Sequence, residues 1–337
     1  MAIRGTVTIL ELESARLAKN PLGDPSRREV PVYLPPGHAE ASGTRFPSVY
    51  ILSGFTGTGR MLLNVPPFDE ALPDRIDRLI ATKAIPPVVV VLPDCSTRHG
   101  GSQYLDSTAT GDYMSHLVEE LVPEIDRRFH TIPAREARAV VGKSSGGFGA
   151  LIAAMDHPGT FGACASHSGD CYFEHCYGQD FPRFVRDMKK RGGLEKFLRE
   201  FSSLEIKDKD EVFLMNIVAM AQAYSPNGKR PPLNFDLPFD LETGELKHGV
   251  FSRWKAWDPV ERAGLRVDAL RSLRALYIDA GDKDEFWLDL GARILSRRLT
   301  SLDVRHRFEE FKGGHFNIQA RYDKSLPFVC GALATKG

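Results

Sequence analysis

Short apolar runs alternate with longer amphipathic stretches along the chain. Uniformly apolar runs predict strands buried on both faces, because a half-exposed strand would alternate apolar and polar residues. The runs PSVYIL at 47–52 and PVVVVL at 87–92 are of this kind. The predicted strands are residues 6–10, 30–34, 47–52, 87–92, 139–141, 163–168, 273–280 and 304–311.

The segments between these strands predict helices. In residues 113–129 the apolar side chains Leu117, Leu121 and Ile125 fall on one side of a helix. Further helices are expected over residues 66–82, 148–155, 284–297 and 322–333. Strands that alternate with helices predict an α/β fold, with a mainly parallel, doubly wound sheet and helices on both faces.

The alternation stops between residues 172 and 260. This segment of about 90 residues far exceeds the roughly 10–12 residues that a crossover needs. It contains helical patterns near 181–190, 194–201 and 210–224, and a proline-rich stretch after them. We interpret residues 1–337 as a single domain in which 172–260 form a cap or lid over the carboxyl edge of the sheet. The alternative is a surface decoration remote from the site.

Composition narrows the function classes. Apolar residues make up 42% of the 337 residues, and 44 basic residues balance 44 acidic ones, so no global field attracts nucleic acid or an anionic membrane. The first thirty residues lack a signal core, and no apolar run is long enough to span a membrane. Five unevenly placed cysteines suit reduced thiols. We therefore expect a cytoplasmic protein, and a homodimer is compatible with the sequence.

The strongest motif is Gly142-Lys143-Ser144-Ser145-Gly146, between the strand at 139–141 and an Ala- and Leu-rich helix. Gly-x-Ser-x-Gly in this context predicts a nucleophile elbow. Side chains at the two glycines would collide with the neighbouring strand and helix. Ser144 would lie at a helix N-terminus, where free N–H groups favour a developing oxyanion. Ser145 is a weaker candidate because no glycine precedes it by two positions, and the bland alternative is a plain turn.

A second glycine-rich turn follows the strand at 47–52. It reads Ser-Gly-Phe-Thr-Gly-Thr-Gly over 53–59 and lacks the Lys-Ser/Thr ending of a phosphate loop. Beside Ser144 it is better interpreted as an oxyanion loop. The backbone N–H near Phe55 would then act with the N–H of Ser145.

A serine nucleophile needs a base and an orienting acid, which follow it in the order acid, then histidine, in this type of fold. The histidines downstream are His248, His306 and His315, of which His315 follows a strand and two glycines. For the acid, Asp282 and Asp284 both lie in the loop after the strand at 273–280. Asp284 could equally cap a helix, so the residues alone leave the two open.

Taken together, these motifs resemble the esterase D family of α/β-hydrolases, which includes S-formylglutathione hydrolases and enterochelin-esterase-like enzymes. The matching segments, in family order, are residues 50–57, 92–97, 101–107, 142–147, 278–286 and 313–315. The resemblance implies an α/β-hydrolase fold, nucleophile Ser144, acid Asp284, base His315, and oxyanion donors at Phe55 and Ser145. It implies no metal or cofactor. The 172–260 insertion is atypical of formylglutathione hydrolases, and relatives often carry a histidine or another residue where this chain has Lys143.

The expected activity is hydrolysis of a small-molecule carboxylic ester through an acyl-enzyme. An acyltransferase or a peptidase/amidase could use the same triad, and a binding protein on a non-catalytic hydrolase fold is the third alternative. Expected substrate contacts come from Tyr104, Trp287 and Phe316.

Several residues admit two interpretations. Asp94 either faces substrate or anchors its loop, and Trp254 and Trp257 are either pocket walls or core. The spacing of Cys171 and Cys176 matches no common zinc pattern, so no metal site is predicted.

Overall fold

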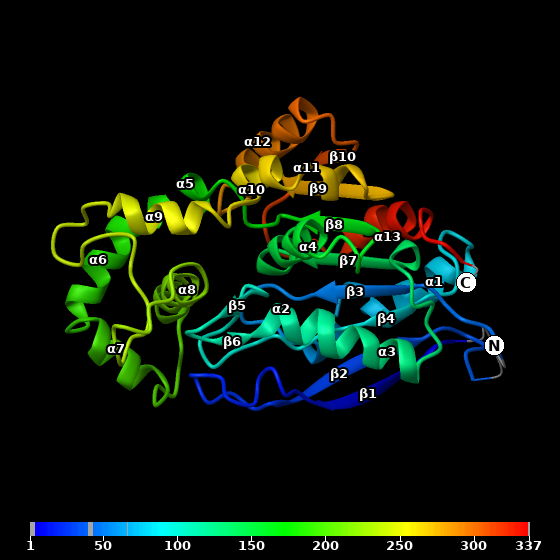
Figure 1. The fold of residues 1–337 in the computed structure, drawn as a ribbon, viewed down its shortest axis with the longest axis horizontal. Helices are drawn as coiled ribbons and strands as arrows, with labels where there is room; N and C mark the ends of the chain where they lie inside the picture. Colours follow the sequence, from blue (N-terminus) through cyan, green and yellow to red (C-terminus); the bar gives the residue numbers. More distant parts are fainter. Residues whose placement is uncertain (1–3, 40–42, 66, 336–337) are drawn as a thin grey trace.

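An eight-stranded sheet forms the centre of the computed structural model, which describes residues 4–39, 43–65 and 67–335 (Figure 1). The strand order is β1-β2-β4-β3-β7-β8-β9-β10. β2 pairs antiparallel with β1 and β4, and every other pairing in this sheet is parallel. The strands are β1 (Thr6–Glu13), β2 (Arg27–Leu34), β3 (Ser48–Leu52), β4 (Val89–Val91), β7 (Arg138–Lys143), β8 (Ala163–His167), β9 (Ala275–Gly281) and β10 (Arg307–Phe311). The predicted mainly parallel α/β sheet is confirmed.

Helices cover both faces of the sheet because its central strands are apolar on both. Val49 and Ile51 of β3 belong to a core that includes α1 (Leu72–Ala81) and α13 (Tyr322–Cys330). Tyr50 and Leu52 belong to the opposite core. That core includes α4 (Ser145–Asp156), α12 (Leu288–Ser301) and the continuous run α2 (Tyr113–Ser115), η2 (His116–Leu121) and α3 (Val122–Arg128). Neighbouring residues of one strand thus point into different cores.

Three helix starts differ from the expectation. The helix α4, expected from 148, begins at Ser145. The helix expected from 284 begins at Leu288, because residues 282–287 form a turn that places Asp284 at its centre. The helix expected over 66–82 begins at Leu72, and Pro66 lies outside the described residues. Short 3-10 turns occur at η1 (Arg60–Leu63), η3 (Arg135–Ala137), η4 (Gly178–Asp180) and η5 (Gln319–Arg321).

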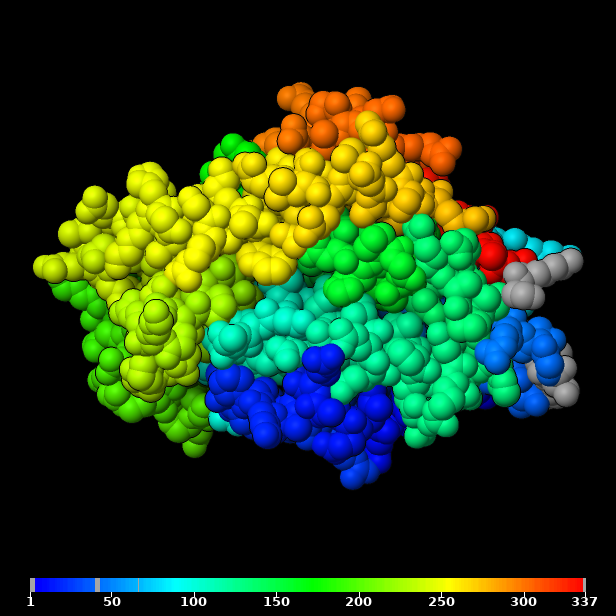
Figure 2. Space-filling view, viewed as in Figure 1, coloured from blue at the N-terminus to red at the C-terminus, as the bar shows by residue number. Residues whose placement is uncertain are grey.

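The insertion, residues 172–260, is mostly helical. It comprises α5 (Phe173–Cys176), α6 (Phe181–Lys190), α7 (Leu194–Phe201), α8 (Lys209–Tyr224), α9 (His248–Lys255) and the start of α10 (Pro259–Leu265). Figure 1 shows α6 to α9 grouped at one end of the molecule, beside the small hairpin β5 (Asp106–Ser107) and β6 (Gly111–Asp112). In Figure 2 the same residues form a green and yellow lobe. α10 and α11 (Val267–Arg271) return the chain to α4 and α12.

The lobe has an aromatic core of its own. Phe181 packs on Phe239 with ring centroids 4.6 Å apart, and on Phe251 and Trp254 at 5.8 Å. Trp254 is completely buried and donates its indole N–H to Ser225 Oγ at 2.8 Å. Trp254 is therefore core, and the alternative of a pocket wall does not hold for it.

Over residues 4–39, 43–65 and 67–335, each helix is too short or too polar to cross a bilayer.

Candidate active site

Ser144 lies at the turn between β7 and α4. Its backbone has φ 58° and ψ −127°. This conformation is energetically unfavourable for any residue other than glycine. A Cβ on Gly142 would lie 2.0 Å from the Gly146 carbonyl oxygen, and one on Gly146 would lie 2.2 Å from the Leu52 oxygen. Both positions therefore require glycine, as the predicted crowding against helix and strand demands.

A continuous hydrogen-bonded series runs from Ser144 to Asp284. Ser144 Oγ is 3.0 Å from His315 Nε2, and His315 Nδ1 is 2.9 Å from Asp284 Oδ2. An ionised carboxylate only accepts hydrogen bonds, so Nδ1 carries the proton and Nε2 accepts from the Ser144 hydroxyl. The fold thus brings together the three residues of the expected triad.

The Asp284 carboxylate is held in its charged form. Burial would raise its pKa, but the hydrogen bond and charge of His315 and the backbone N–H of Phe286, 2.9 Å from Oδ1, outweigh burial. The pKa of Asp284 therefore lies below its ordinary value. A permanent negative charge fixes the tautomer of His315 at neutral pH.

The other candidate acids and bases have different partners. Asp282 is exposed and accepts the Gly313 N–H at 3.1 Å. Asp279 is paired with His167 and Arg321, each at 2.7 Å. His306 contacts Ser296 on the helix α12, and His248 is exposed at the start of α9.

Two backbone donors flank Ser144. Ser145 opens α4, and N–H groups in the first turn of a helix have no intrahelical acceptor. The loop after β3 passes close by, since a Cβ on Gly54 would lie 3.2 Å from Ser144 Cβ. Within the described chain, the N–H of Phe55 donates to no backbone acceptor, whereas the neighbouring Thr56 N–H bonds Gly100. The N–H groups of Phe55 and Ser145 therefore both lack a backbone acceptor among the described residues, and both belong to segments that adjoin Ser144.

Tyr104 holds the loop that follows β3 in place through a hydrogen bond to its backbone. Its hydroxyl donates to the Ser53 carbonyl at 2.8 Å, and its ring packs over Gly149. With 5% of its surface exposed, Tyr104 lies under the loop, where it lines a small cavity together with Phe55 and Ser145, and its contact with substrate stays a prediction. Its burial follows from Gly149, which leaves room for a ring against α4.

Trp287 and Phe316 lie on the surface around His315. They are 49% and 57% exposed, and Phe316 lies 5.2 Å from the His315 ring between centroids. Phe286 packs on His315 at 4.8 Å and joins the same rim. Trp257 instead lies under the Arg262 guanidinium at 4.5 Å.

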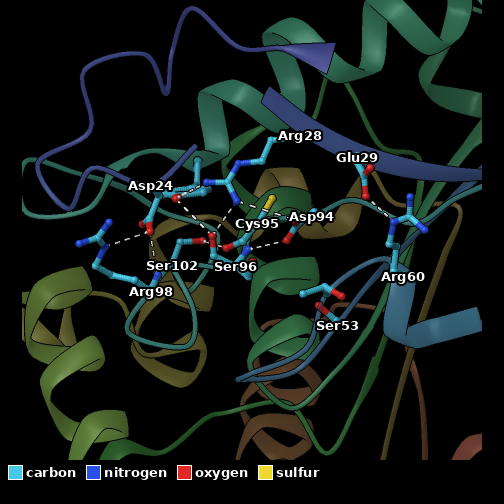
Figure 3. Close-up of polar contacts among 12 residues, drawn as sticks. Asp24, Arg28, Glu29, Ser53, Arg60, Asp94, Cys95, Ser96, Arg98 and Ser102 are labelled. Carbon is cyan, nitrogen blue, oxygen red and sulfur yellow. Dashed lines mark hydrogen bonds and ion pairs between the residues drawn. The ribbon is translucent and has the colours of Figure 1, made fainter. Parts of the chain in front are cut away.

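The loop that follows β4, residues 94–102, is held in place by polar contacts, which Figure 3 shows. Buried Arg28 donates to the Ser96 carbonyl at 3.0 Å and approaches Asp94 to 3.7 Å, while Asp94 accepts the Ser96 N–H at 3.0 Å. Ser102 closes the loop by donating to the Cys95 carbonyl at 2.8 Å. Of the two interpretations of Asp94, the structure supports the loop anchor.

Asp170 is a buried carboxylate beside Ser145 that the sequence did not single out. It accepts hydrogen bonds from Tyr177 Oη at 2.8 Å, Gln103 Nε2 at 3.0 Å and Ser145 Oγ at 3.2 Å. Burial raises its pKa against these hydrogen bonds. The available signal was position: Asp170 follows the strand next to the elbow, at the edge where α/β proteins place functional side chains.

Glu285 is a second residue that the motifs did not reveal. Its carboxylate accepts the backbone N–H of His315 at 2.6 Å. A Cβ on Gly314 would lie 2.7 Å from the same carboxylate. Gly314 therefore lets Glu285 reach the main chain and fix the start of the histidine loop.

The structure gives the cysteines no metal partners among the described residues. There, no group of three His, Cys, Asp or Glu side chains is arranged to hold an ion. Cys171 and Cys176 are buried, and burial raises the pKa of both thiols well above the ordinary value. They pack as core residues at the base of the insertion.

Comparison with known proteins identifies the family. Residues 25–321 match the family model described as "Putative esterase". The chain belongs to this esterase family. An esterase of Mycobacterium tuberculosis is 31% identical over 146 residues, 43% of this chain and 30% of the relative. The mouse S-formylglutathione hydrolase is 28% identical over 159 residues, 42% of this chain and 51% of the relative. The chain thus aligns with only 30% and 51% of the lengths of these two relatives.

Solved structures resemble this chain over nearly its whole length. A ferulic acid esterase superimposes with a TM-score of 0.63 at 20% identity, covering 98% of this chain and 100% of that one. An S-formylglutathione hydrolase from Agrobacterium tumefaciens gives 0.61 at 19% identity, covering 99% and 98%. At this identity the likeness establishes the fold, so the expected α/β-hydrolase fold is confirmed.

Proposed function

We propose that this protein is a serine esterase that cleaves small-molecule carboxylic esters through an acyl-enzyme on Ser144. The observation that carries the proposal is the hydrogen-bonded series Asp284–His315–Ser144, with Ser144 on a strained turn at a helix N-terminus. A binding pocket needs neither the strain nor all three side chains. The names of the relatives and neighbours, esterases and S-formylglutathione hydrolases, agree with this chemistry.

In the proposed mechanism, His315 Nε2 takes the proton of Ser144 as Oγ attacks the ester carbonyl. The carbonyl oxygen becomes an oxyanion, stabilised by the N–H groups of Phe55 and Ser145, at about 3 kcal/mol for each donor. His315 then gives its proton to the leaving alcohol, and the acyl group stays on Ser144. Water repeats the sequence and releases the acid. Asp284 keeps the imidazolium oriented and stabilised throughout.

The insertion would act as a cap on this site. Its residues Tyr177 and Tyr224 both reach Gln103, at 3.3 and 2.8 Å, and Gln103 bonds Asp170 beside Ser145. A decoration remote from the site would have no such contacts. The cap would therefore bound the part of the substrate that lies on the Ser145 side.

Burst kinetics with short-chain 4-nitrophenyl esters test the proposal. The wild type is expected to release one equivalent of nitrophenol rapidly and then turn over, and Ser144→Ala to lose both phases. Ser145→Ala is the matched control: it keeps the backbone N–H, so its burst is expected to keep the same amplitude. Full activity in Ser144→Ala would refute the assignment of the nucleophile.

The same assay separates hydrolysis from acyl transfer. Added short alcohols compete with water for the acyl-enzyme, so an acyltransferase would form a new ester in preference to the free acid. We expect the free acid as the main product. A dominant ester product at low alcohol concentration would change the reaction class while leaving the triad assignment intact.

A further inference from the structure

Lys143 is the residue immediately before Ser144, and none of the chemistry above uses it. Its side chain is half-buried and lines a groove of about 390 Å³. The other walls of the groove are the oxyanion loop, η1, Gln319 and Tyr322. The ammonium lies over the ring of Phe316, 5.1 Å from its centroid. Lys143 therefore places a cation in this groove, one residue along the chain from the candidate nucleophile.

The positive charge of Lys143 has no ion-pair partner. Within the described chain, no carboxylate oxygen lies within 4.0 Å of its Nζ atom. The other charged groups of the groove are paired: Arg75 bonds Asp69 and Asp323, and Glu70 bonds Arg78. Lys143 thus differs from the rest of the groove lining.

The surroundings of Lys143 favour the arrival of a negative charge. Burial lowers its pKa, although the more distant carboxylates of Asp284, Glu285 and Asp170 act in the opposite direction. The Phe316 ring stabilises the partly desolvated ammonium through its π face, but it supplies neither a counter-ion nor a hydrogen-bond acceptor in the ring plane. An anion bound in the groove would restore that stabilisation through a charge-assisted hydrogen bond.

Resting on the esterase function proposed above, we propose that Lys143 binds a carboxylate carried by the alcohol half of the substrate. His315 protonates the leaving alcohol, so the alcohol departs on the side of His315. Phe316 adjoins His315 in sequence and lies under the Lys143 ammonium, and the groove continues along Gln319 and Tyr322. One positive charge suits the single negative charge of a carboxylate.

The alternative is that Lys143 only balances the charges of Asp284 and Glu285. A pair of isosteric substrates separates the two roles. In 4-acetoxybenzoate the leaving alcohol carries a carboxylate, and in 4-acetoxybenzamide it carries a neutral amide of the same shape. Loss of an ionic contact lowers kcat/KM for the benzoate alone, whereas loss of charge balance lowers kcat/KM for both.

The variants are Lys143→Met, Lys143→Arg and the control Lys83→Met. Lys83 is exposed in the turn that leads into the start of β4, at the sheet edge opposite Ser144. We expect the benzoate-to-benzamide ratio of kcat/KM to fall about tenfold or more in Lys143→Met. Lys143→Arg should retain part of the preference, and Lys83→Met should match the wild type. An equal loss for both substrates in Lys143→Met would overturn the proposal.

A second series fixes the side of the substrate. Mono-4-nitrophenyl adipate and 4-nitrophenyl hexanoate differ by a carboxylate at the end of the acyl chain. A dependence on Lys143 in this series, and none in the benzoate series, would overturn the assignment to the alcohol half.

A binding measurement makes the test independent of turnover. Calorimetric titration of 4-hydroxybenzoate and 4-hydroxybenzamide is expected to show tighter binding of the benzoate to wild type and Ser144→Ala, and loss of that difference in Lys143→Met. Equal binding of both ligands to the wild type would refute the carboxylate site. If the wild type shows no nitrophenol burst but still binds 4-hydroxybenzoate more tightly than 4-hydroxybenzamide, the esterase function is refuted and the carboxylate site at Lys143 is retained.

Discussion

Asp282 and Asp284 show how two residues of the same type in one turn acquire different environments. Asp282 is exposed and holds the main chain at Gly313, while Asp284 is buried and bonds the His315 ring. Their spacing along the chain did not distinguish them. The distinction comes from the turn at 282–287, whose backbone N–H groups converge on Asp284.

This difference leads to a prediction for the acid. Asp284→Asn would leave an amide opposite His315 Nδ1, favour the wrong tautomer and remove the charge that stabilises the imidazolium. We expect kcat for a neutral short-chain ester to fall by about 10³- to 10⁴-fold, the range typical of such an acid. Asp282→Asn is the matched control, two residues away in the same turn, and is expected to stay within a fewfold of the wild type. A comparable loss in both variants would mean that the turn, and not the carboxylate, is what matters.

At the scale of elements, the strands could be predicted because their cause is local. A strand buried on both faces needs apolar residues at consecutive positions, and PSVYIL and PVVVVL meet that condition without reference to the rest of the chain. The elbow could also be predicted, because its glycines are required by the close approach of the adjacent strand and helix. The start of α12 could not, since Asp284 is an equally good cap for a helix beginning there. Its Oδ1 does accept the Phe286 N–H, but Trp287 has a left-handed backbone with φ 60°, and the helix begins only at Leu288.

The elbow packs so closely against β3 that position 146 has no room for a side chain. A methyl group in Gly146→Ala would meet the backbone of Leu52 and Ser53 at 2.2 to 2.6 Å, which no side-chain rotation relieves. We expect the free energy of unfolding to fall by about 3 kcal/mol, with a loss of the nitrophenol burst. Gly159→Ala is the control, because nothing lies within 4 Å of its added methyl group, and it should change the free energy by less than about 1 kcal/mol. Equal stabilities in urea titration would contradict this account of the elbow.

On the scale of the whole molecule, the sequence predicts an insertion over residues 172–260 but does not show which of its residues reach the site. Tyr177 and Tyr224 approach Gln103 across 74 and 121 residues of chain, and neither lies in a recognisable motif. Periodicity reports which side of a helix is buried, but it does not report what that side is buried against. Asp170 was overlooked for the same reason, since its partners come from three separate segments.

The coupling between insertion and elbow gives the last prediction. Tyr177→Phe removes the shortest of the hydrogen bonds that Asp170 accepts, at 2.8 Å, and leaves the buried carboxylate with fewer donors while Ser145 still depends on it. We expect a loss of about 1–3 kcal/mol in the free energy of unfolding, together with a slower burst, because the turn that presents Ser144 and the Ser145 N–H is held less firmly. Tyr172→Phe is the matched control from the same segment: Tyr172 packs on His175, and its hydroxyl has no acceptor among the described residues. Urea titration and burst kinetics of the two variants, side by side, are the measurement. If Tyr177→Phe loses stability but keeps the wild-type burst rate, the insertion is fastened at Asp170 without influencing the nucleophile. If the free energy of unfolding and the burst rate both fall in Tyr177→Phe and neither falls in Tyr172→Phe, the insertion helps to hold the nucleophile in position.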